Sequence, residues 1–91
     1  MERELTISNK LGLHARPAAE FVRCARKFKC RISIRKDGEQ YSADSILDVL
    51  SANLDCGSRF LLHAEGPDAK EALDTVAELF EQFRQQEDSE E

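Results

Sequence analysis

The stretch CRISIRKDGEQYSA, residues 30–43, decides the fold class. Its first half alternates apolar and polar residues, the pattern of a strand with one buried face and one wet face, and Ser33 is expected on the wet face. Asp37-Gly38 is a strong hairpin-turn signal, so Gln40 to Ala43 can return as a second strand. The stretch therefore predicts an antiparallel strand pair.

The residues before this hairpin predict a strand followed by a helix. Alternation over residues 3–8 indicates a short strand, and residues 9–12 are typical of a loop. Pro17 favours the first turn of a helix, where its missing N–H costs nothing. An apolar stripe at three- and four-residue steps predicts a helix of about twelve residues. The stripe consists of Ala18, Phe21, Val22, Ala25 and Phe28.

The residues after the hairpin predict a short helix, a strand and a long helix. Ser45 and Asp48 stand three residues apart, as in a capping box, and the helix is expected to end near Asn53. Residues 59–65 alternate like a strand, and residues 66–68 open the last helix. The core face of that helix is expected to carry Ala69, Leu73, Val76, Phe80 and Phe83.

The predicted order is therefore β-α-β-β-α-β-α. Four strands with amphipathic helices indicate an α+β fold in which an antiparallel or mixed sheet has one face covered by helices and the other exposed. Residues 1–84 form the expected domain. Residues 85–91 are polar and acidic and are expected to be a disordered tail.

Composition restricts the class of protein. The chain has 91 residues, of which 41% are hydrophobic and 34% charged, as in one globular domain. No apolar run approaches the roughly 20 residues of a membrane span, and the start of the chain lacks the apolar core of a signal peptide. The three cysteines, Cys24, Cys30 and Cys56, form no metal-binding spacing. Free thiols, no metal and a cytoplasmic location are expected.

Charge is distributed unevenly along the chain. Residues 15–36 contain eight Lys and Arg and one Glu, whereas residues 37–91 contain three Lys and Arg and fifteen Asp and Glu. A local cationic region on an acidic chain suits an anionic ligand or an acidic protein partner. Nucleic-acid binding is disfavoured, because the pI is about 5.0 and these cations are accompanied by only two aromatic residues, Phe21 and Phe28.

His14 is the candidate for chemistry. It precedes a predicted helix, and the free N–H groups and dipole of a helix N-terminus favour anions. A neutral imidazole keeps a lone pair and can act as a nucleophile at this position. The guanidinium of Arg16 offers planar donors suited to a phosphoryl group, and Gly12 permits a tight turn beside it. On spacing alone, an ordinary exposed loop residue is the favoured interpretation of His14.

Residues 9–18, Asn-Lys-Leu-Gly-Leu-His-Ala-Arg-Pro-Ala, resemble the active-site signature of HPr, the histidine-containing phosphocarrier family of the bacterial sugar phosphotransferase system. The resemblance extends over about residues 3–84 and implies an open-faced β-sandwich. It also implies that His14 accepts a phosphoryl group at Nδ1 from phosphorylated enzyme I, charged by phosphoenolpyruvate, and donates it to the A domain of a sugar permease. Arg16 would hold the phosphoryl group, Pro17 would fix the helix start, and no cofactor is implied.

The resemblance also implies a regulatory site and a docking surface. Ser45 is similar to the serine that HPr kinase/phosphorylase modifies, although Asp44 and Asp48 would repel a phosphate there. Three apolar residues of the short helix that follows Ser45 correspond to a partner-docking patch, namely Ile46, Leu47 and Leu50. On the first helix, Arg23, Arg26 and Lys27 would steer acidic partners.

Other functions remain open at this stage. The 66–68 turn and the acidic tail resemble the corresponding segments of carriers in the nitrogen-related regulatory branch of the same system. A Ser45-regulated protein-binding module and a small-molecule-binding regulatory domain are further alternatives. His63 lies on a predicted strand and is expected to be structural. The sequence has no GxxxxGK[ST] loop of the kind that hydrolyses nucleotides, and we expect a carrier without enzymatic turnover of its own. A monomer is expected, because a carrier must present His14 to two proteins in turn.

Overall fold

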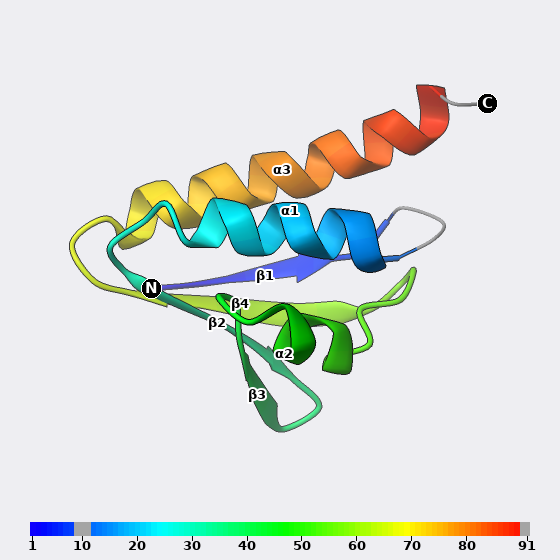
Figure 1. Ribbon diagram of the computed structural model, residues 1–91. Helices are drawn as coiled ribbons and strands as arrows, with labels where there is room; N and C mark the ends of the chain where they lie inside the picture. Colours follow the sequence, from blue (N-terminus) through cyan, green and yellow to red (C-terminus); the bar gives the residue numbers. More distant parts are fainter. Residues whose placement is uncertain (9–11, 90–91) are drawn as a thin grey trace.

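The computed structural model describes residues 1–8 and 12–89, with side chains as far as Gln85. Asn9, Lys10 and Leu11 of the motif therefore lie outside the described residues. The described elements are β1 (Glu2–Thr6), α1 (Ala15–Ala25), β2 (Arg31–Lys36), β3 (Glu39–Ser42), α2 (Ile46–Ser51), β4 (Arg59–Glu65) and α3 (Ala69–Ser89) (Figure 1). This order is the predicted one.

The sheet has the strand order β1-β4-β2-β3, and every neighbouring pair is antiparallel. The register places Leu5 opposite Phe60 and Ile32 opposite Ala64, so the apolar residues of β1, β2 and β4 share one face. Helices α1 and α3 lie side by side and antiparallel over the sheet, and α2 packs beside α1 (Figure 1). The predicted open-faced sandwich is confirmed.

The core lies between this sheet face and the helices. Phe21 of α1 is fully buried, and its ring meets Phe80 of α3 edge-on with the ring centres 5.2 Å apart. Phe80 also contacts Phe60 of β4 and Phe83 of α3, both at 5.7 Å. Such aromatic contacts add to the area that the rings bury. They fix α1, whose first turn follows His14, to α3 and β4.

Several local expectations need correction. Helix α1 ends at Ala25, so Phe28 lies in the following connection, half-buried, and is not part of the helix. Ser33 is only 4% exposed, because His63 and Ser42 flank it in register on the open face of the sheet. Helix α3 continues from Gln85 to Ser89, where an unstructured segment was expected. The residues of this last turn contain no Gly or Pro that would end a helix.

Asp68 fastens the start of α3 to the start of β2. Its carboxylate accepts the backbone N–H groups of Lys29 and Cys30, each with an N···O distance of 2.8 Å. The hydrogen bond from the Lys29 N–H holds the pKa of Asp68 below its usual value. Burial, together with the hydrogen bond to Asp68, raises the pKa of the Cys30 thiol to about 11. Cys24, Cys30 and Cys56 are free thiols.

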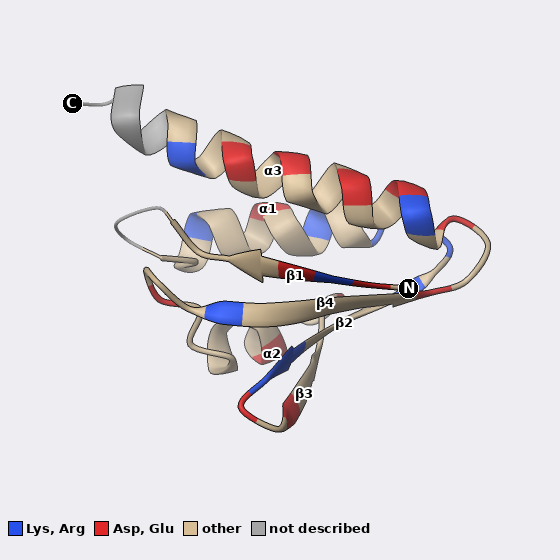
Figure 2. Ribbon diagram, turned by 180° about the vertical axis from the view of Figure 1, so that it is seen from behind, with Lys and Arg blue, Asp and Glu red and all other residues tan. Residues whose placement is uncertain are grey.

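Within the described ranges, no helix is both long enough and apolar enough to cross a membrane. The two signs of charge predominate on different elements, with mostly Asp and Glu along α3 and mostly Lys and Arg on α1 and β2 (Figure 2). The separation of charge along the sequence is therefore also a separation in space.

Candidate functional site

His14 stands at the N-terminus of α1. It is the N-cap residue, with φ −93° and ψ −166°, and its carbonyl oxygen accepts the N–H of Ala18 at 2.8 Å. An N-cap side chain commonly accepts a hydrogen bond from the helix. The His14 side chain makes no such bond, and the residue is exposed. The imidazole is therefore accessible to a partner protein from solvent.

The first turn of α1 offers two free amides beside His14. Pro17 has no N–H, and the N–H of Ala18 is already bonded to His14. The amides of Ala15 and Arg16 are thus the ones that the helix leaves without an acceptor. Of the four amides that a helix N-terminus leaves without a partner in the helix, the one at the position of Pro17 is missing here. The turn contains no acidic residue, so nothing on it repels an anion.

Arg16 is exposed in the same turn, two residues after His14. Its guanidinium has no hydrogen-bond or ion-pair partner among the described residues. Pro17 is half-buried at the third helical position, where the sequence predicted it within the first turn. These groups together can hold a phosphoryl group, namely the accessible imidazole of His14, the two free amides and the unpaired guanidinium of Arg16.

A loop from a distant part of the chain supports this site. Gly12 has φ +68°, and a Cβ there would come within 2.8 Å of the Leu54 carbonyl oxygen and 2.9 Å of the Asp55 Cα. The N–H of Leu13 donates to the Leu54 carbonyl oxygen at 2.7 Å. The sequence indicated a tight turn at Gly12 but gave no signal for its contact with Leu54 and Asp55.

Ser45 caps α2, as its spacing from Asp48 predicts. Its Oγ accepts the N–H of Asp48 at 3.4 Å. The Asp48 carboxylate does not complete the capping box, because it accepts the N–H of Ser42 at 3.0 Å. The Ser42 hydroxyl donates to the carboxylate of Asp44. Both carboxylates therefore help to fix the turn that leads into Ser45.

The predicted docking residues gather where α1 and α2 meet. A groove of about 330 Å³ is lined by Ala19, Val22, Arg23, Arg26 and Ile46. Beside it on α2, Leu47 is 73% exposed and Leu50 is 38% exposed, whereas Val49 is buried. Lys27 is exposed after the end of α1 and does not line the groove. The groove with Leu47 and Leu50 is called the α1/α2 surface below.

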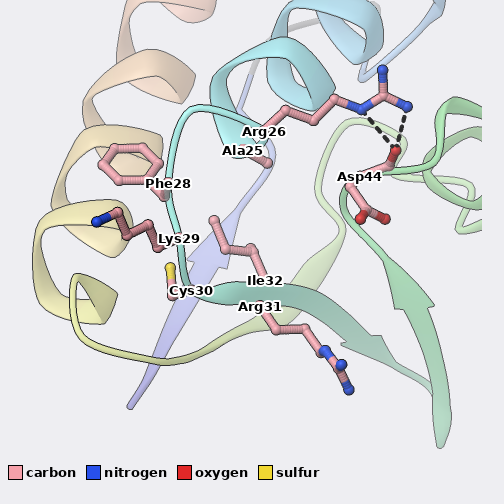
Figure 3. A pocket seen from close by; sticks show the side chains of 8 residues that line it. All are labelled: Ala25, Arg26, Phe28, Lys29, Cys30, Arg31, Ile32 and Asp44. Carbon is pink, nitrogen blue, oxygen red and sulfur yellow. Dashed lines mark hydrogen bonds between the residues drawn. The ribbon is translucent and has the colours of Figure 1, made fainter.

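Arg26 connects the two helices of this surface. Its Nε and Nη2 donate to the Asp44 carbonyl oxygen at 3.1 and 2.8 Å (Figure 3). Arg26 also borders a pocket of about 310 Å³ at the end of α1 remote from His14. Lys29 and Arg31 border that pocket too, but their side chains extend to opposite sides (Figure 3). The pocket therefore lacks convergent cations.

The other histidine belongs to a different surface. His63 lies on β4, with its Nδ1 3.3 Å from the Glu2 carboxylate, which is itself 3.5 Å from Arg35. These residues share the sheet face that the helices leave open. In the part of the chain whose side chains are described, no group of three or more His, Cys, Asp or Glu could hold a metal ion.

A family model for the phosphorylation site of the HPr component of the phosphotransferase system matches residues 1–82. The chain belongs to the HPr family. Phosphocarrier protein HPr of Cupriavidus necator is 38% identical over 79 residues, which cover 87% of this chain and 89% of that protein. Phosphocarrier protein NPr of Proteus mirabilis is 36% identical over 80 residues, which cover 87% and 89%.

HPr structures share the fold described above. The crystal structure of HPr-C-His from Thermoanaerobacter tengcongensis superimposes with a TM-score of 0.86 at 42% identity, covering 89% of this chain and 91% of that one. The resemblance drawn from the motif at residues 9–18 is thereby confirmed at the level of the family. HPr proteins are phosphocarriers of the phosphotransferase system, so phosphocarrier function is supported for this chain as well.

Proposed function

We propose that this chain carries a phosphoryl group on Nδ1 of His14, accepting it from phosphorylated enzyme I and donating it to the A domain of a sugar permease. The observation that carries the proposal is the accessible His14 imidazole beside the free amides of Ala15 and Arg16. On acceptance, the bond between His14 Nδ1 and phosphorus forms as the donor's bond to phosphorus breaks. On donation, the Nδ1–phosphorus bond breaks as the acceptor's bond to phosphorus forms.

Each neighbour of His14 has a distinct part in the proposal. Arg16 places its guanidinium against the phosphoryl oxygens, and the helix dipole adds partial positive charge. Pro17 fixes the first turn and so the direction of the two amides. Exposure of His14 allows in-line approach by either partner in turn. A monomer in the cytoplasm fits this role, because it can present the same site to each partner in turn.

The α1/α2 surface is the proposed docking site for both partners. The exposed Leu47 and Leu50 would be covered on docking, together with half-buried Ile46. Arg23, Arg26 and Lys27 would face acidic residues of the partner. Arg26 already binds the Asp44 carbonyl oxygen, so it contributes both positive charge and the placement of α2.

Ser45 is the proposed regulatory position, open to an HPr kinase/phosphorylase. As the N-cap of α2 it stands at the helix end that favours a phosphate. The carboxylates of Asp44 and Asp48 oppose a phosphate there through like-charge repulsion. We therefore expect phosphorylation of Ser45 to be slow relative to that of an Asp48→Asn variant. Equal rates for both proteins would remove this argument.

The deciding experiment incubates the chain with phosphoenolpyruvate, magnesium and enzyme I and measures intact mass. We expect wild type to gain one acid-labile phosphoryl group, and His14→Ala to gain none. His63→Ala is the matched control, because it removes the chain's other histidine from the open sheet face, and it should be labelled like wild type. Labelling of His14→Ala, or no labelling of wild type by a verified cognate enzyme I, would contradict the proposal.

The acceptor distinguishes the two branches of the system. An NPr protein is among the relatives, so a carrier of the nitrogen-related branch is the second candidate. Phosphorylated protein is offered in parallel to a sugar-permease A domain and to the A-domain protein of the nitrogen-related branch. Faster transfer to the first supports the sugar branch, and faster transfer to the second replaces it with the regulatory branch.

A further inference from the structure

Lys36, the last residue of β2, binds backbone carbonyl groups at the end of α2. Its side chain is half-buried, and its Nζ donates to the carbonyl oxygens of Ala52 at 3.0 Å and Asn53 at 2.8 Å. In the sequence Lys36 is one of eight cations between residues 15 and 36. The structure shows that its charge is directed at the backbone, unlike the exposed cations of α1.

The two carbonyl groups mark the point where the chain leaves α2. Ala52 is the C-cap of the helix, and Asn53 follows in the left-handed conformation with φ +52°. Carbonyl groups at a helix C-terminus have no partner within the helix, and the helix dipole is negative there. One ammonium group that binds both carbonyls therefore fixes the direction in which residues 53–55 depart.

Those departing residues form the support of the His14 loop. Leu54 is 2% exposed, and its carbonyl oxygen accepts the N–H of Leu13 at 2.7 Å. Gly12 packs so closely on Leu54 and Asp55 that no Cβ could fit between them. The connection from the Lys36 ammonium runs through Asn53 and Leu54 to Leu13, the residue directly before His14.

We propose that Lys36 is a positioning residue for the phosphoryl site. It holds the 53–55 segment in place, and this segment holds the backbone from which His14 and the amides of Ala15 and Arg16 are presented. Lys36 does not touch the phosphoryl group, and it acts through hydrogen bonds in the backbone. Its effect on phosphoryl chemistry rests on the function proposed above, whereas its effect on the Leu13 hydrogen bond does not.

The first test needs no phosphorylation. Lys36→Met keeps the aliphatic chain but removes the donors, and Lys36→Arg restores them. Lys29→Met is the matched control, because it removes a cation whose side chain is exposed and has no partner among the described residues. Amide hydrogen exchange followed by NMR should show Leu13 exchanging roughly fivefold faster in Lys36→Met. Lys36→Arg and Lys29→Met should match wild type.

Amides of the central strands separate positioning from general loss of stability. The amides of Ile34 and Leu62, in β2 and β4, report global opening. The proposal expects Leu13 to lose protection by a larger factor than these amides. Equal losses at all three, or unchanged protection of Leu13, would overturn it.

The second test measures the lifetime of phosphorylated His14 after enzyme I is removed. Because no partner is present, the rate of spontaneous hydrolysis reports the phosphoryl site without any contribution from docking. Lys36→Met should change this rate by roughly threefold relative to wild type, with Lys36→Arg restoring it. An unchanged rate in Lys36→Met would overturn the link to the phosphoryl site. If wild type itself takes no phosphoryl group, the proposed function fails while the exchange result stands.

Discussion

Gly12 is the residue at which the backbone of the phosphoryl site tolerates least change. An alanine there meets two separate costs. A left-handed φ of +68° is unfavourable by about 1–2 kcal/mol for a residue with a Cβ. The Cβ would also collide with the Leu54 carbonyl oxygen, and overpacking of this kind costs roughly 1–3 kcal/mol. We expect Gly12→Ala to lower the free energy of unfolding by the sum of both, measured by urea denaturation, and to slow phosphorylation of His14.

Gly38 provides the matched control for this prediction. It also has a positive φ, of +81°, but a Cβ there would meet nothing within 4 Å. Gly38→Ala should therefore show the conformational cost alone and leave phosphorylation unchanged. Equal destabilisation by the two substitutions would show that the loop at Leu54 moves aside without cost.

Asp68 should make stability depend on pH. Its pKa is lower in the folded chain than in the unfolded one, because its carboxylate accepts the Lys29 N–H. A carboxyl with a depressed pKa stabilises the fold above its unfolded pKa, about 4, and this contribution is lost as the pH falls through the folded pKa. Asp68→Asn should therefore unfold at lower urea concentration than wild type at pH 7, with the difference shrinking below about pH 4.

Glu78→Gln controls for the loss of one negative charge, since Glu78 is exposed on α3, the helix that begins directly after Asp68. It should leave the urea midpoint at pH 7 close to that of wild type. A constant difference between Asp68→Asn and wild type from pH 7 to pH 2 would show that ionisation of Asp68 does not contribute to stability.

At the scale of elements, α2 is short enough that a single cap matters. The helix has six residues, and Ser45 supplies its side-chain cap. Loss of an N-cap hydroxyl costs about 1 kcal/mol, so Ser45→Ala should lower the free energy of unfolding by that amount. Ser51→Ala removes the same hydroxyl from an exposed residue that donates to the Leu47 carbonyl oxygen, and should cost less than about 0.5 kcal/mol. The two costs are compared by thermal or urea unfolding, and equal values would contradict a capping role.

The elements themselves could be predicted because their signals are local. Alternation in residues 30–35, the Asp37-Gly38 turn and the spacing of Ser45 from Asp48 each depend on neighbours in the sequence. The details that differed depend on partners outside the local pattern. Ser33 is buried by the strands that pair with β2. The Asp48 carboxylate binds the N–H of Ser42, six residues earlier, in preference to the N–H of Ser45.

At the scale of the whole molecule, the phosphoryl site is assembled from segments about 40 residues apart. His14, Arg16 and Pro17 could be identified from the sequence because they are contiguous. The support at Leu54 and the contribution of Lys36 could not be identified, since they join a loop, a strand end and a helix end that only the fold brings together. Hydrogen bonds to backbone carbonyls leave no residue pattern, because any residue type supplies the acceptor.

The separation of charge between α1 and α3 gives the last prediction. With acidic side chains along α3 and cations at the α1/α2 surface, an acidic partner is attracted toward one side of the molecule (Figure 2). Reversing two cations, in Arg23→Glu with Lys27→Glu, should slow phosphorylation by enzyme I roughly tenfold at low salt. The difference should shrink near 0.1 M salt and above, where the Debye length is about 10 Å. Arg59→Glu with Lys70→Glu makes the same change in net charge at exposed residues of β4 and α3 and should have little effect. Transfer rates that are equal for both double variants at every salt concentration would show that docking does not depend on Arg23 and Lys27.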